Sequence, residues 1–132
     1  MSYFVLYGDD FPLDDFIKDI GIIPTEAYRK DEEFIRCKNK HPRYEKAWKF
    51  ETDYVMTDFP EELIHKVADT LFNSVDIIIY YKEKYNLECK VMTVVNFKSS
   101  QTRGIGINTR LIEFAYKVKA EYKFDIYTKV IK

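Results

Sequence analysis

The chain contains little cysteine, and this scarcity indicates the compartment in which it folds. Only Cys37 and Cys89 occur among 132 residues, whereas a secreted domain of this size that depends on disulfides usually carries more. The N-terminus lacks a basic segment followed by an apolar run of signal-peptide length. The longest strongly apolar run, residues 77–81, is far shorter than a bilayer crossing requires. We therefore expect a cytoplasmic protein without a membrane-spanning segment.

An excess of charge of one sign is also lacking, because the formal net charge is −1. Such a chain has no overall attraction for nucleic acid or for acidic membranes. Aromatic residues make up 17% of the sequence. This share excludes a disordered chain, since disordered chains have few aromatics and a large charge imbalance. The length predicts one globular domain over residues 1–132.

Motifs that mark common catalytic sites are missing as well. The sequence has no Gly-x-Ser-x-Gly elbow, and residues 104–106 lack the third glycine and the Lys-Ser/Thr ending of a phosphate-binding loop. Cys37 and His41 are spaced like half of a zinc site. No second half follows, since Cys89 falls in an apolar strand pattern and His65 in a helical pattern. We expect no catalytic residue, no cofactor and no metal.

The chain does contain many carboxylates near its N-terminus, with five aspartates within residues 8–19. Carboxylates this close together suit a divalent cation. The start of a helix explains them better, because Asp10 is placed as an N-cap and Pro12 suits the first turn. Asp14 and Asp15 then face the positive end of the helix dipole. The stretch therefore predicts a helix rather than a metal site.

Hydrophobic periodicity alternates along the chain between that of strands and that of helices. Alternating patterns predict strands over residues 3–8, 47–54, 87–97, 104–107 and 120–127. Helical patterns predict a helix from Asp10 to a Gly21 C-cap, a second one that starts with an Asp58 cap, a third over residues 74–85, and a fourth that starts with an Asn108 cap. The apolar stripe of the fourth helix comprises Leu111, Ile112, Ala115 and Val118.

Residues 74–85 are ambiguous, because their β-branched and aromatic composition is also typical of a strand. We favour a helix, since Ser74 and Asn86 suit its two ends. Residues 29–46 are charged throughout and predict a loop or a loose hairpin. The whole pattern predicts an α+β fold: a single mixed, largely antiparallel sheet with three to four helices packed mainly on one face. The strand over 87–97 has apolar residues on both faces, so we place it inside the sheet.

Two stretches carry a resemblance to a known family. They are the opening Phe4-Val5-Leu6-Tyr7-Gly8-Asp9-Asp10-Phe11 with Gly21-Ile22-Ile23-Pro24-Thr25, and the ending 105–115 with Asp125-Ile126-Tyr127. Together they resemble a bacterial family of domains of unknown function, number 4279 in that series, and Trp48 falls where the family commonly has a tryptophan. Asn108-Thr109 departs from the family's usual aspartate followed by a helix-starting residue, but asparagine caps equally well. The resemblance implies domain limits near the two ends of the chain, and no activity or cofactor.

Charge is segregated along the sequence. Aspartates dominate residues 8–19, whereas lysines and arginines dominate residues 36–49. Since complementary charge steers protein encounters, our leading hypothesis is a small non-enzymatic binding module with a protein partner, of immunity or regulatory type. Exposed tyrosines such as Tyr80, Tyr81 and Tyr127 would anchor such a partner. Association with further copies of the same chain is also compatible with the sequence.

Two alternatives remain. The first is an enzyme or small-ligand binder whose cleft is lined by Asp9, Asp10, Trp48 and Tyr127. The second is single-stranded nucleic-acid binding through residues 36–49, where basic side chains would contact phosphates and aromatic rings would stack on bases. The acidic residues just before this stretch and the near-neutral net charge disfavour the second alternative. The candidate binding residues are therefore Asp9, Asp10, Arg43, Trp48 and Tyr127.

Overall fold

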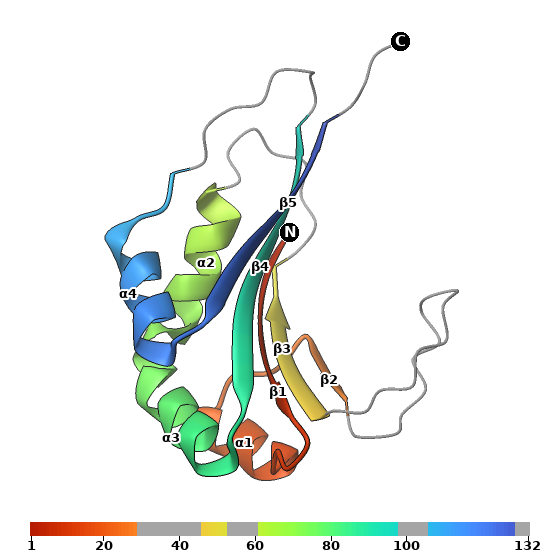
Figure 1. Ribbon diagram of the computed structural model, residues 1–132, viewed down its shortest axis with the longest axis vertical. Helices are drawn as coiled ribbons and strands as arrows, with labels where there is room; N and C mark the ends of the chain where they lie inside the picture. Colours follow the sequence, from red (N-terminus) through yellow and green to blue (C-terminus); the bar gives the residue numbers. More distant parts are fainter. Residues whose placement is uncertain (29–45, 53–60, 98–105, 129–132) are drawn as a thin grey trace, which may run out of the picture.

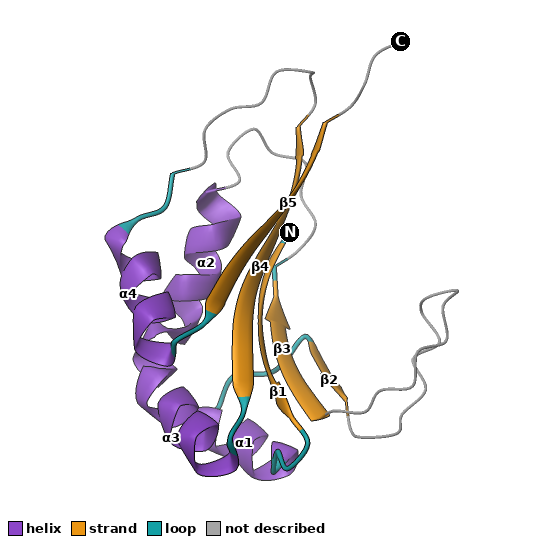
Figure 2. Cartoon of the chain, in the orientation of Figure 1, coloured by secondary structure: helices purple, strands orange, loops and turns teal. Residues whose placement is uncertain are grey.

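The computed structural model describes residues 1–28, 46–52, 61–97 and 106–128. Within them, five strands form one sheet: β1 (Ser2–Gly8), β2 (Glu26–Tyr28), β3 (Lys46–Glu51), β4 (Glu88–Phe97) and β5 (Glu121–Thr128). The helices are α1 (Leu13–Ile20), α2 (Glu61–Leu71), α3 (Val75–Tyr85) and α4 (Thr109–Val118), with a 3₁₀ turn over Phe72–Ser74. Helices α2, α3 and α4 lie along one face of the sheet, and α1 packs at its lower end (Figure 1). Figure 2 shows these two layers, so the predicted α+β class with one mixed sheet is confirmed.

The strand order in the sheet is β2-β3-β1-β4-β5. Neighbouring strands run antiparallel except β4 and β5, which are parallel because α4 carries the chain back between them. The prediction that residues 87–97 form an inner strand is confirmed. Alternate residues face the helices: Phe4 is paired with Phe50 and Val91, and its ring contacts Phe114 of α4 with centroids 5.5 Å apart. None of the described helices has the length and apolarity of a bilayer crossing.

The ambiguous segment 74–85 is helical, as we favoured. Val75, Ile78 and Tyr81 recur at helical spacing in α3 and are all buried. Asn86 ends the helix in the left-handed conformation with φ of 54°, which asparagine tolerates. Ser74 occupies the N-cap position, but its side chain makes no capping hydrogen bond. Burial of one helical face therefore overrides the strand-like composition.

The start of α1 differs from the prediction. The helix begins at Leu13 with Pro12 at the N-cap position, and no side chain caps it, so Asp10 is not the cap. Pro12 has φ −78° and ψ 77°, and the Leu13 N–H donates to the Phe11 carbonyl at 2.9 Å. This inverse γ-turn supplies a partner for an amide that a cap would otherwise satisfy. The predicted C-cap at Gly21 is confirmed, with φ of 68°.

The start of α4 agrees with the prediction, but its buried face does not. Asn108 Oδ1 accepts the Leu111 N–H at 2.9 Å, so the predicted cap is present. Phe114 is buried in the apolar face, whereas Ile112 is 57% exposed and was wrongly predicted to be inside. Of the predicted strand over 104–107, the described residues 106 and 107 are not in a strand. The predicted loop 29–46 (apart from Lys46, the first residue of β3), the end of the strand 47–54 and the Asp58 cap lie outside the described residues.

A row of hydroxyl groups on the helix-covered face runs from Thr52, the residue after β3, across β1 and β4 to β5, and the sequence patterns did not predict it. The Ser2 N–H donates to Thr52 Oγ1 at 2.9 Å, and Ser2 Oγ lies 3.0 Å from Thr93 Oγ1. Thr93 Oγ1 in turn lies 3.0 Å from the Tyr122 hydroxyl. Ser2, Thr52 and Thr93 are each at most 3% exposed. Since each buried hydroxyl has a hydrogen-bond partner, the polar row is compatible with the apolar core around it.

Candidate binding surface

The structure does not bring the four residues of the predicted cleft together. Asp9 and Asp10 are exposed in the turn after β1. At this end of β1, Tyr7 pairs with Glu88 of β4. Tyr127 pairs with Asn96, at the opposite end of β4. Eight residues of extended chain separate the two positions, which is roughly 25 Å at the rise of a strand. These side chains therefore do not line a common cleft, and Arg43 lies outside the described residues.

Trp48 belongs to the core rather than to a surface. Its side chain is fully buried, and the ring of Phe16 meets it edge-on with centroids 5.4 Å apart. The Phe4 ring also lies edge-on to the indole, with centroids 6.4 Å apart. Within the described residues, the indole N–H has no hydrogen-bond partner. Trp48 therefore joins α1 to the sheet and is not available to stack on a base.

Of the tyrosines predicted as partner anchors, Tyr81 is buried and wrongly assigned to the surface. It is 5% exposed, and its hydroxyl donates to the Asp19 carboxylate. Burial, together with this hydrogen bond, raises the pKa of Tyr81 above its usual range. Tyr80 and Tyr127 are exposed, as predicted, each at 55%. Tyr80 is held by Lys84, whose Nζ lies 3.0 Å from the tyrosine hydroxyl.

Cys89 and the carboxylates give no sign of a reactive centre in the described part of the chain. The Cys89 thiol is 6% exposed and donates to the Val118 carbonyl at 3.4 Å. Burial raises the pKa of this thiol to about 11, so it is protonated and a poor nucleophile at neutral pH. No group of three or more His, Cys, Asp or Glu side chains in the described residues is arranged to hold a metal ion.

A shallow pocket of about 220 Å³ lies between the C-terminal ends of α3 and α4. Lys82 lines it, together with Lys117 and Lys119. The Lys82 ammonium donates to the carbonyls of Val118 and Lys119, at 2.8 and 3.1 Å. It therefore neutralises the negative end of α4. The pocket is smaller than most ligand sites, and the Lys82 ammonium that lines it already binds the carbonyls at the end of α4.

The exposed large apolar side chains of the described residues gather mainly in α4, in β5 and at Ile107, just before the α4 N-cap. On α4, Ile112 and Tyr116 are 57% and 81% exposed and lie one helical turn apart on the same side. On β5, Phe124 and Ile126 are 36% and 50% exposed. Tyr127 and Ile107 are also exposed. This concentration is the most distinctive surface feature of the described part of the chain.

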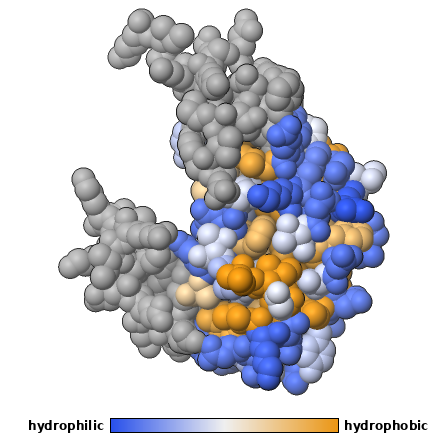
Figure 3. Space-filling view, turned by 180° about the vertical axis from the view of Figure 1, so that it is seen from behind, coloured by the Kyte–Doolittle hydropathy of each residue, from blue (hydrophilic) through white to orange (hydrophobic). Residues whose placement is uncertain are grey.

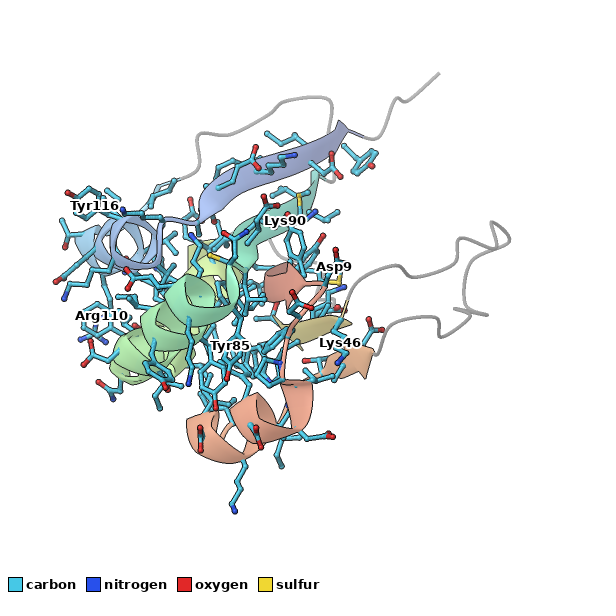
Figure 4. All side chains as sticks on the ribbon, turned by 60° about the horizontal axis from the view of Figure 1, so that its bottom comes forward. Asp9, Lys46, Tyr85, Lys90, Arg110 and Tyr116 are labelled. Carbon is cyan, nitrogen blue, oxygen red and sulfur yellow. The ribbon has the colours of Figure 1, made fainter. Side chains whose placement is uncertain are left out.

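These side chains lie beside an open strand edge. β5 is the last strand of the sheet, and no described strand pairs with its outer side. Figure 4 shows Tyr116 on the side of α4 that faces the same way as this outer edge, and Arg110 on the opposite side of the helix. Arg110 is paired there with Asp69 at 3.0 Å and lies over the ring of Phe72. We call the outer edge of β5 with Ile112, Tyr116, Phe124 and Ile126 the α4–β5 surface.

On the helix-free face, the β2–β3 end of the sheet has a different character, because the charges of Lys49, Glu51 and Glu26 are paired with one another. Lys49 lies 3.0 Å from Glu51 and 3.9 Å from Glu26, and its ammonium sits 4.1 Å from the centre of the Tyr3 ring. The Lys49 side chain is only 17% exposed. This basic residue of the predicted 36–49 stretch is therefore engaged within the fold.

Figure 3 shows another hydrophobic area on the reverse side, where the segment from α1 to β2 passes behind the sheet in Figure 1. Ile22, Ala27 and Phe50 belong to this end of the sheet, and each is partly buried and packed against the core. Ile23 is exposed at 88%. Much of this area is therefore the outer side of core residues rather than a set of free apolar side chains.

The fold and surface define a small α+β domain without a recognisable catalytic centre in its described part. The chain belongs to the family described as Domain of unknown function (DUF4279), whose model matches residues 1–129. The resemblance predicted from the two ends of the sequence is thereby confirmed. Comparisons with curated proteins and with solved structures give no significant match. The family description names no activity, so the function is argued from the surface.

Proposed function

We propose that this protein is a non-enzymatic binding module that engages a protein partner through the α4–β5 surface. This proposal rests mainly on the exposure of Ile112 and Tyr116, at 57% and 81%, beside an edge of β5 with which no described strand pairs. Contiguous exposed apolar side chains mark interaction sites. An open edge strand offers backbone hydrogen bonds to an incoming chain. The two features on the same side of the molecule fit one protein partner.

The composition of the surface supports a protein rather than a nucleic acid or a small molecule. Tyrosine and aliphatic side chains are typical anchors of protein interfaces. Nucleic-acid binding needs free basic side chains and accessible rings, but Lys49 is ion-paired and Trp48 is buried. In this proposal the module works in the bacterial cytoplasm, where an immunity-type or regulatory role needs no catalytic residue. Its scarce cysteines fit a reducing compartment.

Site-specific photo-cross-linking tests the proposal. A benzophenone amino acid in place of Tyr116, in cells of the native host, is expected to give a covalent adduct with a protein, which mass spectrometry identifies. The matched control carries the same group in place of Tyr80, which is exposed at 55% on α3, away from the α4–β5 surface. No adduct from position 116, or equal yields from both positions, would contradict the proposal.

A further inference from the structure

We infer that the protein bound at the α4–β5 surface is a second copy of this chain, paired antiparallel along β5 about a two-fold axis at Phe124. The inference rests on the proposed function of this surface and names its partner. Antiparallel pairing of two edge strands would satisfy the outer backbone groups of both at once. It would join the two five-stranded sheets into one continuous sheet.

The charges of β5 are self-complementary in this register. With the axis at Phe124, Lys123 faces Asp125 of the partner subunit, and the reciprocal pair forms on the other side of the axis. Opposite charges directly across a strand pair are favourable, and like charges are unfavourable. An axis at Lys123 would place two lysines face to face, and an axis at Asp125 would place two aspartates face to face. An axis at Tyr122 would also place opposite charges, Glu121 and Lys123, across the pair, but it would pair only residues 121–123 of β5, whereas the axis at Phe124 pairs residues 121–127. Charge and strand overlap together therefore select the register centred on Phe124.

Lys123 and Asp125 are both on the helix-free face and both accessible. Within its own chain Lys123 lies 3.6 Å from Glu121, but the two side chains are 49% and 65% exposed. A pair exposed to this extent contributes little, so the ammonium is able to turn toward a partner. On the other face, Tyr122 faces Ile126 of the partner subunit in the same register, and two Phe124 side chains meet at the axis. Both faces of the paired strands therefore match.

The exposed side of α4 fits the same arrangement. A two-fold axis perpendicular to the sheet keeps both helical layers on one face, so the two α4 helices come side by side. Leu111 of α4 packs in one cluster with Tyr122 of β5, which places α4 close to this edge. Tyr116 lies on the side of α4 that faces the same way as the outer edge of β5 in Figure 4, and Ile112 lies one helical turn before it on the same side. Both side chains would then meet the partner's α4. This contact accounts for apolar side chains that the single chain leaves in water.

The opposite edge of the sheet explains why pairing stops at two copies. Among the described residues that edge is β2, which covers Glu26–Tyr28. A short edge strand offers few backbone groups to another chain. Isologous pairing of β5 with β5 is closed by its symmetry, whereas pairing of β5 with a different edge would grow into fibres.

Sedimentation velocity of the purified full chain over a range of concentrations tests the inference. We expect a monomer–dimer equilibrium whose dissociation constant rises at least about tenfold in K123E and in D125K, because each change places like charges across the axis. The double variant K123E/D125K restores opposite charges and is expected to restore the dimer. Lys66→Glu, a charge reversal at an exposed position of α2, is the control and leaves the equilibrium unchanged.

The outcomes separate this inference from the proposed function. A purified chain that stays monomeric at all concentrations overturns the inference. A dimer whose dissociation constant is unchanged in K123E and D125K also overturns it, and so does a dimer that the double variant does not restore. If the chain is monomeric while position 116 cross-links to a different protein, the surface binds proteins but not a second copy. If the chain is monomeric and position 116 gives no adduct, both proposals fail.

Discussion

At the scale of single residues, the fold changes the proton affinity of side chains without making them reactive. Tyr81 and Cys89 are both nearly excluded from water, and burial disfavours the ionised form of each. Raised pKa values of this kind occur at active sites. Here each group has a hydrogen-bond partner within the fold: Tyr81 donates to the carboxylate of Asp19, an exposed residue, and Cys89 donates to the Val118 carbonyl. The raised pKa values of Tyr81 and Cys89 therefore reflect their burial in the packed fold.

Cys89 predicts a specific dependence of stability on pH. Its pKa is raised from 9.0 to about 11 in the folded chain. Below pH 9 the thiol is protonated in both states and the full contribution to stability is present. Between pH 9 and 11 the unfolded chain loses its proton first, so the free energy of unfolding falls by about 2 kcal/mol. Urea denaturation under reducing conditions measures this decline.

The matched variant for this measurement is Cys89→Ala, which keeps Cys37 and every other titrating group. Its free energy of unfolding is lower at pH 8, because a buried sulfur is lost. It then lacks the contribution of Cys89 to the decline, so the difference between the two proteins shrinks as the pH approaches 11. A difference that stays constant from pH 8 to pH 11 would show that burial does not hold this thiol protonated.

At the scale of secondary-structure elements, α1 and α4 show that similar sequence signals at a helix start can lead to different local structures. Both starts carry a capping residue type before an apolar repeat, and sequence patterns predicted a cap at each. At α4 the Asn108 side chain bonds to the Leu111 N–H. At α1 Phe11 is fully buried and the chain makes a γ-turn at Pro12, which leaves Asp10 in solvent. Tertiary burial of one side chain therefore decides which cap forms.

This contrast predicts unequal effects of two alanine substitutions. Asn108→Ala removes a formed cap and should lower the free energy of unfolding by about 1 kcal/mol. Asp10→Ala removes an exposed side chain that caps nothing and should change it by less than about 0.5 kcal/mol. Asn108→Asp keeps an acceptor and serves as the conservative control. Equal losses in the two alanine variants, measured by urea denaturation, would contradict the assigned helix starts.

The elements were largely predictable, whereas the surface was not. The apolar strand pattern over 87–97 located β4, and the ambiguous segment 74–85 was assigned to a helix because Ser74 and Asn86 suit the two ends of one. The exposure of Ile112 was missed, since an apolar residue next to the buried stripe has the same period as the stripe itself. The predicted cleft failed for another reason: whether Asp9 and Tyr127 meet depends on strand order and direction. Those are properties of long-range pairing that no local pattern carries.

At the scale of the whole molecule, a row of hydroxyls joins strands that are far apart in sequence. Thr52, Ser2, Thr93 and Tyr122 come from the end of β3 and from β1, β4 and β5, so one polar row spans most of the sheet. Thr93 occupies the centre of the row and has contacts on both sides. Buried hydrogen-bond networks are costly when partly satisfied. Thr93 should therefore contribute more to the free energy of unfolding than the size of its side chain suggests.

Thr93→Val should therefore lower the free energy of unfolding by about 1–3 kcal/mol, although valine has nearly the same shape. The loss arises because the partly buried Tyr122 hydroxyl loses its bond to Thr93, and the buried Ser2 hydroxyl keeps the Met92 carbonyl but loses the Thr93 hydroxyl. The isosteric control is Thr70→Val, whose hydroxyl bonds only to the Lys66 carbonyl within α2 and is near solvent. The control should change stability by less than about 0.5 kcal/mol.

The double variant Thr93→Val with Tyr122→Phe decides whether the row acts as a network. Tyr122→Phe alone removes the hydroxyl at the end of the row, and in the double variant no tyrosine hydroxyl remains to be left unpaired by the loss of Thr93. The double variant should consequently lose less stability than the sum of the two single variants, with a coupling of about 0.5 kcal/mol or more. Strict additivity in urea denaturation would mean that Thr93 and Tyr122 contribute independently, and that the sheet is held across β4 and β5 by apolar packing and backbone pairing alone.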